Sequence, residues 1–100
     1  MTVFWTNNAK RELRAVYEYI AQNSVRYAQG MVDRITRKTG QLSKMPYLGA
    51  AVPEYDDVTI RELLEQAYRI IYRVRTDRID ILSVVHGSRQ LPSEVPGNGS

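Results

Sequence analysis

Arginine side chains recur along the stretch Tyr68–Arg75, where apolar and basic residues alternate. Because successive side chains of a strand point to opposite faces, Arg69, Arg73 and Arg75 would share one face and leave an apolar face for a core. Guanidinium groups bind carboxylates and phosphates bidentately, and they can stabilise the charged transition state of RNA cleavage. The pattern indicates a site for a negatively charged partner or a nuclease site, and a solvated sheet face is the third interpretation.

A nuclease would also need a group that moves protons. His86, the single histidine of the chain, lies at the end of an expected strand, and Glu62 is a second candidate for this role. Arg69, Arg73 and Arg89 would then be the cations. The alternative interpretation is that the histidine is a hydrogen-bonded structural residue.

The composition excludes several classes of site. The 100 residues include no cysteine and one histidine, which rules out disulfides, thiolate-rich metal sites and multi-histidine metal sites. The chain also lacks a phosphate-binding glycine loop, so we predict neither a metal nor a cofactor. A net charge of +3 permits nucleic acid or an acidic protein as the partner. Without a signal peptide or an apolar run of about 18 residues, we expect no membrane association and a cytoplasmic protein.

Two amphipathic helices are predicted in the first half of the chain, after a short strand over residues 3–6. The first helix follows capping side chains at residues 6–8 and ends near Gln22. The second runs from about Val25 to Ser43, before the Met45-Pro46 pair. Short spacing between them predicts an antiparallel hairpin. The expected buried positions are Leu13, Val16, Tyr17, Ile20 and Ala21 in the first helix, and Ala28, Met31, Val32, Ile35 and Leu42 in the second.

Three strands are predicted in the second half, over residues 58–64, 68–76 and 79–86, separated by short turns. Short connections make neighbouring strands antiparallel. The fold class is therefore α+β, with an N-terminal strand and a helix hairpin on one face of an antiparallel sheet. We expect one domain over residues 1–91 and a flexible tail over residues 92–100. The arginines would lie on the other, partly open sheet face.

Several segments together resemble the RelE/ParE superfamily of bacterial type II toxins. The similarity extends over about residues 3–91, and its pieces are specific in combination rather than singly. They are Trp5-Thr6, Ala9, Tyr19-Ile20-Ala21, Val52-Pro53-Glu54-Tyr55, Ile60-Arg61-Glu62-Leu63, Tyr68-Arg69-Ile70-Ile71-Tyr72-Arg73-Val74, Ile79-Asp80-Ile81-Leu82 and His86-Gly87-Ser88-Arg89.

The resemblance implies a fold, a partner and two alternative targets. The fold is the one described above, and the partner is a cognate antitoxin that wraps the toxin and silences it, which allows a toxin–antitoxin hetero-oligomer. ParE-like members inhibit DNA gyrase and serve plasmid stabilisation. RelE-like members cut mRNA on the ribosome.

Residue by residue, the resemblance to the nuclease members is incomplete. Arg69 matches a catalytic arginine of RelE-like nucleases, and His86 and Arg89 fall near two further catalytic positions. The catalytic lysines of those nucleases would fall near Ile60 and Glu62, which are not basic, and no tyrosine follows position 72. We therefore expect a ParE-like gyrase inhibitor, with the ribosome-dependent nuclease as the alternative.

The predicted partner-binding side chains all lie on the expected sheet. A basic protein surface is complementary to an acidic segment, and antitoxin tails of this kind are usually disordered alone. We expect such a segment to lie along the helix hairpin and the sheet, with carboxylates opposite some arginines. The predicted partner-binding set is Arg61, Arg69, Arg73 and Arg75.

Overall fold

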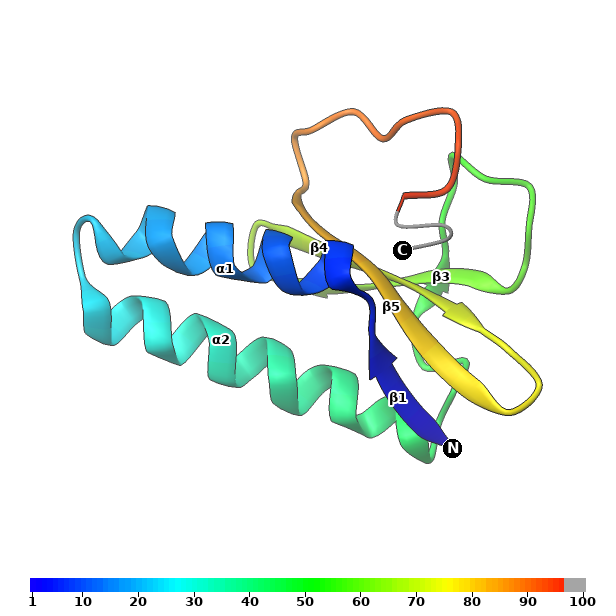
Figure 1. Ribbon diagram of the computed structural model, residues 1–100. Coiled ribbons are helices and arrows are strands. Elements are labelled where there is room, and N and C mark those ends of the chain that lie inside the picture. Colours follow the sequence, from blue (N-terminus) through cyan, green and yellow to red (C-terminus); the bar gives the residue numbers. More distant parts are fainter. Residues whose placement is uncertain (97–100) are drawn as a thin grey trace.

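A helix hairpin stacks on one side of a five-stranded sheet in the computed structural model, which describes residues 1–96 (Figure 1). The expected α+β fold is confirmed. The elements in chain order are β1 (Thr2–Trp5), α1 (Asn7–Ala21), α2 (Val25–Gly40), the 3-10 turn η1 (Gln41–Ser43), β2 (Ala50–Ala51), β3 (Ile60–Glu65), β4 (Tyr68–Val74) and β5 (Arg78–His86).

Hydroxyl side chains begin both helices. The Oγ1 atom of Thr6 accepts a hydrogen bond from the backbone N–H of Ala9, and Ser24 does the same for Tyr27. The second helix ends as an α-helix at Gly40, earlier than predicted, and continues as the 3-10 turn η1 to Ser43, because the last turn of a helix is often of the tighter 3-10 type. No helix within residues 1–96 is long and apolar enough to cross a membrane.

The sheet order is β1-β5-β4-β3-β2, and the sheet is mixed. The three long strands form the predicted antiparallel meander, but β1 pairs with β5 in parallel. The helix hairpin between β1 and the later strands supplies the long crossover that a parallel pair requires. The two-residue strand β2 was not predicted, because Ala50 and Ala51 give no strand pattern.

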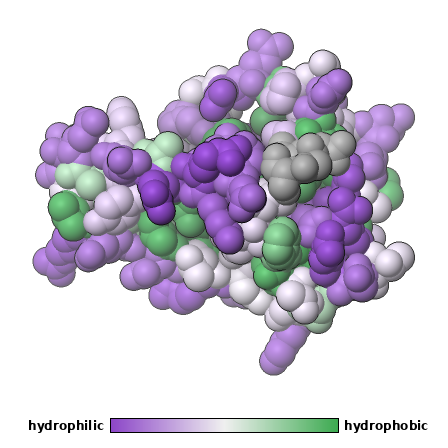
Figure 2. Space-filling view, viewed as in Figure 1, coloured by the Kyte–Doolittle hydropathy of each residue, from purple (hydrophilic) through white to green (hydrophobic). Residues whose placement is uncertain are grey.

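The main core lies between the helix hairpin and the sheet. The predicted alternation in β4 is confirmed, since Tyr68, Ile70, Tyr72 and Val74 all face this core. Of the predicted buried positions, Val16, Met31, Ile35 and Leu42 belong to this core, and Leu13 and Ile20 pack against it. Ala28 is also buried, whereas Tyr17, Ala21 and Val32 are only partly buried. Figure 2, in the same view, shows hydrophobic residues gathered in the furrow between the two helices, with hydrophilic residues around them.

A second, smaller core covers part of the opposite sheet face. It consists of Val52, Ile60, Ile71, Leu82, Val85 and Leu91, with Tyr55 and Val95 packed against it. The segment after β5 crosses over this face (Figure 1). The Tyr55 hydroxyl lies 2.9 Å from the carbonyl oxygen of Pro92 and 3.2 Å from that of Glu94. The predicted flexibility of residues 92–100 stays a prediction, and residues 97–100 lie outside the described residues.

Tyr72 fastens the loop before β2 to the centre of the sheet. Its side chain is fully buried, and its hydroxyl donates to the carbonyl oxygen of Pro46 and accepts from the N–H of Gly49, both at 2.9 Å. Burial raises the pKa of the phenol. A Cβ atom at position 49 would meet the carbonyl oxygen of Glu62 and the Tyr72 hydroxyl, so this close approach requires glycine.

We expect Tyr72→Phe to lower the free energy of unfolding by about 1–3 kcal/mol, because a buried N–H and a buried carbonyl lose their partner. Urea unfolding of the two proteins measures the difference. Tyr47→Phe is the matched control, since Tyr47 is 54% exposed, and its effect should stay within about 0.5 kcal/mol. Equal losses in both variants would contradict the role assigned to the Tyr72 hydroxyl.

Candidate partner-binding site

Arg69, on β4, is enclosed between two carboxylates. Its Nε atom donates to Glu62 at 2.6 Å, and its Nη1 and Nη2 atoms form a bidentate ion pair with the Glu54 carboxylate at 2.7 and 2.9 Å. The arginine side chain is only 13% exposed. Hydrogen bonds to Glu54, and then to Glu62, raise the pKa of Arg69 despite its partial burial. All three guanidinium nitrogens are therefore engaged in holding β3 and the loop after β2 against β4.

Arg61, on β3, also makes internal contacts. Its Nε atom donates to the carbonyl oxygen of Gly49 at 2.8 Å, and Nη1 donates to that of Val58 at 3.1 Å. The guanidinium lies 5.1 Å from the ring centre of Tyr47, within cation–π range. This side chain thus connects the loops on both sides of β2, and its predicted role in partner binding stays a prediction.

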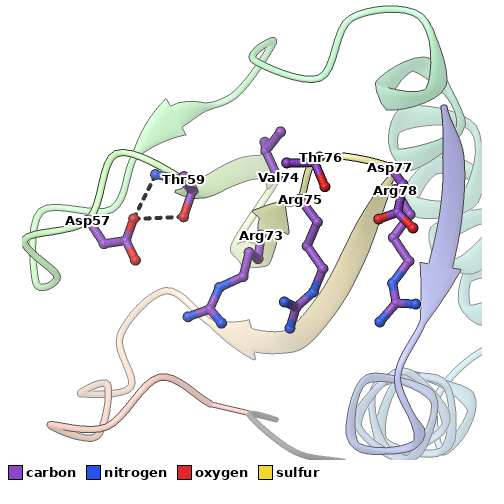
Figure 3. A pocket seen from close by; sticks show the side chains of 8 residues that line it. All are labelled: Asp57, Thr59, Arg73, Val74, Arg75, Thr76, Asp77 and Arg78. Carbon is purple, nitrogen blue, oxygen red and sulfur yellow. Dashed lines mark hydrogen bonds between the residues drawn. The ribbon is translucent and has the colours of Figure 1, made fainter.

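Three other arginines line one hollow at the turn between β4 and β5. Figure 3 shows the guanidinium groups of Arg73, Arg75 and Arg78 pointing in the same direction. The Nε atoms of Arg75 and Arg78 both donate to Asp80, the latter at 2.8 Å. Asp80 is 5% exposed at its side chain, whereas the two arginines are 40% and 47% exposed. The carboxylate thus holds both guanidinium groups at the surface.

Arg73 differs from the other arginines of this face. Within residues 1–96 its side chain makes neither a hydrogen bond nor an ion pair, and its Nε atom is buried without a partner. Asp57 also lines the hollow, but its carboxylate accepts from the N–H of Thr59 at 2.9 Å and from the hydroxyl at 2.6 Å. Those bonds, with a smaller contribution from Arg73, lower the pKa of Asp57.

The predicted catalytic residues do not converge on one point. His86, on β5, lies opposite Tyr68 of the neighbouring strand β4, and both side chains project from the sheet face that bears the helices. The two rings pack edge to face, with their centres 5.6 Å apart. Arg89 lines the same depression as these two residues. Arg69 pairs with Val85, one residue along, and therefore points to the opposite face. His86 is exposed, and its Nδ1 atom lies 2.7 Å from the Ser88 hydroxyl.

Sequence reasoning missed Arg78 and Asp80 as parts of the hollow. Arg78 lies in what was predicted to be a turn, so its side chain was not assigned to a sheet face. The sequence does contain a signal for this pair. Residues two apart on a strand project from the same face, so a strand beginning at Arg78 places the side chains of Arg78 and Asp80 next to each other. Within the described part of the chain, no three histidine or acidic side chains gather so that they could hold a metal ion.

The helix hairpin on a five-stranded sheet recurs in solved structures. The chromosomal ParDE TA system from P. aeruginosa contains a chain that is 27% identical, with a TM-score of 0.71 over 86% of this chain and 95% of that chain. The YoeB dimer from Staphylococcus aureus has a TM-score of 0.58 over 83% of this chain and 92% of that chain, and at 17% identity it shows the fold alone. A search of curated protein sequences found no match. The fold is therefore the one shared by ParE and YoeB.

A family model described as "ParE toxin of type II toxin-antitoxin system, parDE" matches residues 3–91. The chain belongs to this family. The match runs from β1 to Leu91, which packs in the second core, so it takes in the helix hairpin, the meander and the first part of the segment that crosses the sheet. The predicted resemblance to the RelE/ParE superfamily is thereby confirmed.

Arg69→Ala should lower the free energy of unfolding by about 1–3 kcal/mol, because it leaves two carboxylates facing each other without a cation. Denaturant unfolding of the variant and the parent protein measures the loss. Adding Glu62→Gln to Arg69→Ala should recover part of it, since one unpaired charge is removed. If Arg69→Ala is as stable as the parent protein, the bridge has no structural role.

The free energy of unfolding should fall as the pH is lowered from about 6 to about 3. The pKa of Glu54 is lowered, first by its hydrogen bond from Arg69, and Thr59 lowers that of Asp57. A depressed carboxyl pKa stabilises the fold above the unfolded-state pKa, and this contribution is lost as the pH falls through the folded-state pKa. Arg69 stays charged over this range and adds no slope.

Unfolding in denaturant at the two pH values measures the effect. Glu54→Gln should show a smaller difference between the two pH values than the parent protein. An unchanged difference in Glu54→Gln would mean that the Arg69 bridge does not contribute to acid sensitivity.

Proposed function

We propose that this toxin acts by binding DNA gyrase and inhibiting it, without chemistry of its own. The observation that carries the proposal is the state of Arg69, whose guanidinium is bound by Glu54 and Glu62. A catalytic cation must be free to meet the charge that develops on a scissile phosphate. Here one positive charge faces two negative charges, so the neighbourhood disfavours a phosphate. Membership of the ParE toxin family supports the same target.

The positions that would supply further nuclease groups also support a binding mechanism. The resemblance to RelE-like nucleases places their lysines near Ile60 and Glu62. Ile60 is fully buried in the second core, and Glu62 is negatively charged and paired. Neither side chain can stabilise a phosphate, and the side chains of His86 and Arg69 project from opposite faces of the sheet.

The second candidate function is a ribosome-dependent mRNA endoribonuclease. One observation favours it: His86 and Arg89 are exposed and line a common depression with Tyr68. A histidine next to an arginine can move a proton while the cation stabilises a phosphate. This arrangement would use a different face from the one that bears Arg69.

The proposed second partner is a cognate antitoxin with an acidic segment that is partly disordered alone. The furrow between the helices is lined mainly by apolar side chains and is a suitable groove for an amphipathic segment. Its lining comprises Trp5, Lys10, Leu13, Arg14, Tyr17 and Val32. The complex would be a toxin–antitoxin hetero-oligomer. Gyrase and ribosomes both place the proposed site of action in the bacterial cytoplasm.

Purified toxin should inhibit DNA supercoiling by gyrase and should leave mRNA uncut in a cell-free translation reaction. Supercoiling gels and primer-extension mapping of the mRNA measure the two activities on the same preparation. Codon-phased cuts with gyrase unaffected would refute the gyrase proposal and favour the nuclease. In that case Arg69→Ala, His86→Ala and Arg89→Ala would separate the two faces, because the variants that stop cutting identify the catalytic one.

A further inference from the structure

We propose that the hollow lined by Arg73, Arg75 and Arg78 is a docking site for carboxylate side chains of an acidic peptide segment, contributed by the antitoxin. The inference rests on the proposed function only in naming the antitoxin as the source of that segment. It assigns partner recognition to the turn between β4 and β5, and it replaces Arg61 and Arg69 with Arg78 in the set of contacting arginines.

The hollow offers hydrogen-bond donors that the fold leaves unused. Arg75 and Arg78 each bind Asp80 through Nε, and within residues 1–96 their Nη1 and Nη2 atoms make no hydrogen bond. A guanidinium held through one nitrogen keeps its outer nitrogens available for a second carboxylate. Asp80 therefore acts as a positioning residue that orders two cations before a partner arrives, which reduces the entropy lost on binding.

Arg73 is the third cation and lacks any partner in the described part of the chain. Of its nitrogens only Nε is buried, so the two outer nitrogens can meet a ligand. Its side chain points in the same direction as those of Arg75 and Arg78 (Figure 3). A half-buried guanidinium without a partner is costly in the isolated protein, because its lost hydration is not replaced. An incoming carboxylate would remove that cost.

The charges around the hollow favour a peptide over nucleic acid. The lining includes two acidic side chains, Asp57 and Asp77, in addition to the three arginines. A nucleic-acid backbone carries closely spaced phosphates and requires a continuous basic surface, so it would meet these acids. A peptide can place single carboxylates between them and leave neutral residues opposite them.

An exposed aromatic ring lies beside the arginines and indicates that the antitoxin segment also contains an apolar side chain. Phe4, on the edge strand β1, pairs with Asp80 in the sheet and is 49% exposed. Its ring centre lies 5.7 Å from the guanidinium carbon of Arg78. The ring is an apolar surface beside the cations, so the segment that fits combines carboxylates with at least one apolar side chain.

Arg73→Ala should weaken antitoxin binding on the order of 30-fold, because the partner's carboxylate loses its cation in a partly desolvated site. Titration calorimetry with the purified cognate antitoxin measures the dissociation constant. Arg26→Ala is the matched control, since it removes the same charge from an exposed position on α2 and should leave the dissociation constant within about twofold. Thermal unfolding of both variants verifies that they are folded.

A second measurement uses the unaltered toxin and does not depend on how a variant folds. The arginine Nε–H signals of Arg73, Arg75 and Arg78 in NMR spectra should shift when the antitoxin is added, whereas that of Arg26 should not. If those three signals stay in place in the saturated complex, the hollow is not the docking site. An unchanged dissociation constant for folded Arg73→Ala would overturn the proposal in the same way.

Two further outcomes would assign the hollow to another ligand and overturn the proposal. One is that Arg73→Ala keeps its antitoxin affinity but no longer inhibits gyrase. The other is that the toxin binds a DNA duplex of about 20 base pairs through Arg73, whereas added antitoxin leaves the NMR signals of the three arginines in place. Failure of the unaltered toxin to inhibit gyrase would refute the proposed function alone, because the antitoxin titrations remain interpretable.

Discussion

Burial of both faces of β4 is the constraint on which the rest of the structure depends. Ile70 and Tyr72 face the helix hairpin, and Ile71 faces the second core, all without exposed surface. Two polar side chains of this strand, Tyr72 and Arg69, find their partners inside the protein. Tyr72 therefore holds the loop before β2, and Arg69 holds the loop after it. These two side chains thus fix the backbone on both sides of β2.

The sheet adjusts to this constraint by a bulge between β4 and β5. The register shifts between Ile71 and Tyr72, so that Ile81 and Val84 both reach the main core although they are three residues apart. Leu82 is the extra residue of β5, and the hydroxyl of the following residue, Ser83, donates to Glu12 of α1 at 2.6 Å. The same carboxylate accepts from the N–H of Val84 at 3.1 Å. These two hydrogen bonds join the irregular part of β5 to α1 and satisfy the backbone N–H of Val84.

Local patterns predicted the elements well, and contacts between distant residues were the part they could not supply. Alternation in β4 and the helical stripes depend on neighbours within one element, so the tyrosine face and the helix hairpin could be predicted. One of the two partners of Arg69, Glu54, is 15 residues away in a loop, and no period connects it to the strand. Leu91 and Val95 are isolated apolar residues among prolines, so their role in covering the second face left no pattern. The arginine face could be predicted, but not which of its arginines would be occupied.

The two proposed contact surfaces are linked through β1. Trp5 lines the furrow between the helices, and its neighbour Phe4 borders the arginine hollow on the opposite face. Adjacent residues of a strand point to opposite faces, so Trp5 reaches the apolar furrow while Phe4 reaches the arginine hollow. Since β1 lies at the edge of the sheet, an extended segment passing along it can reach both faces without entering the core. We therefore expect a single antitoxin chain, rather than two separate modules, to occupy the furrow and the hollow together, with the second contact strengthened by the first.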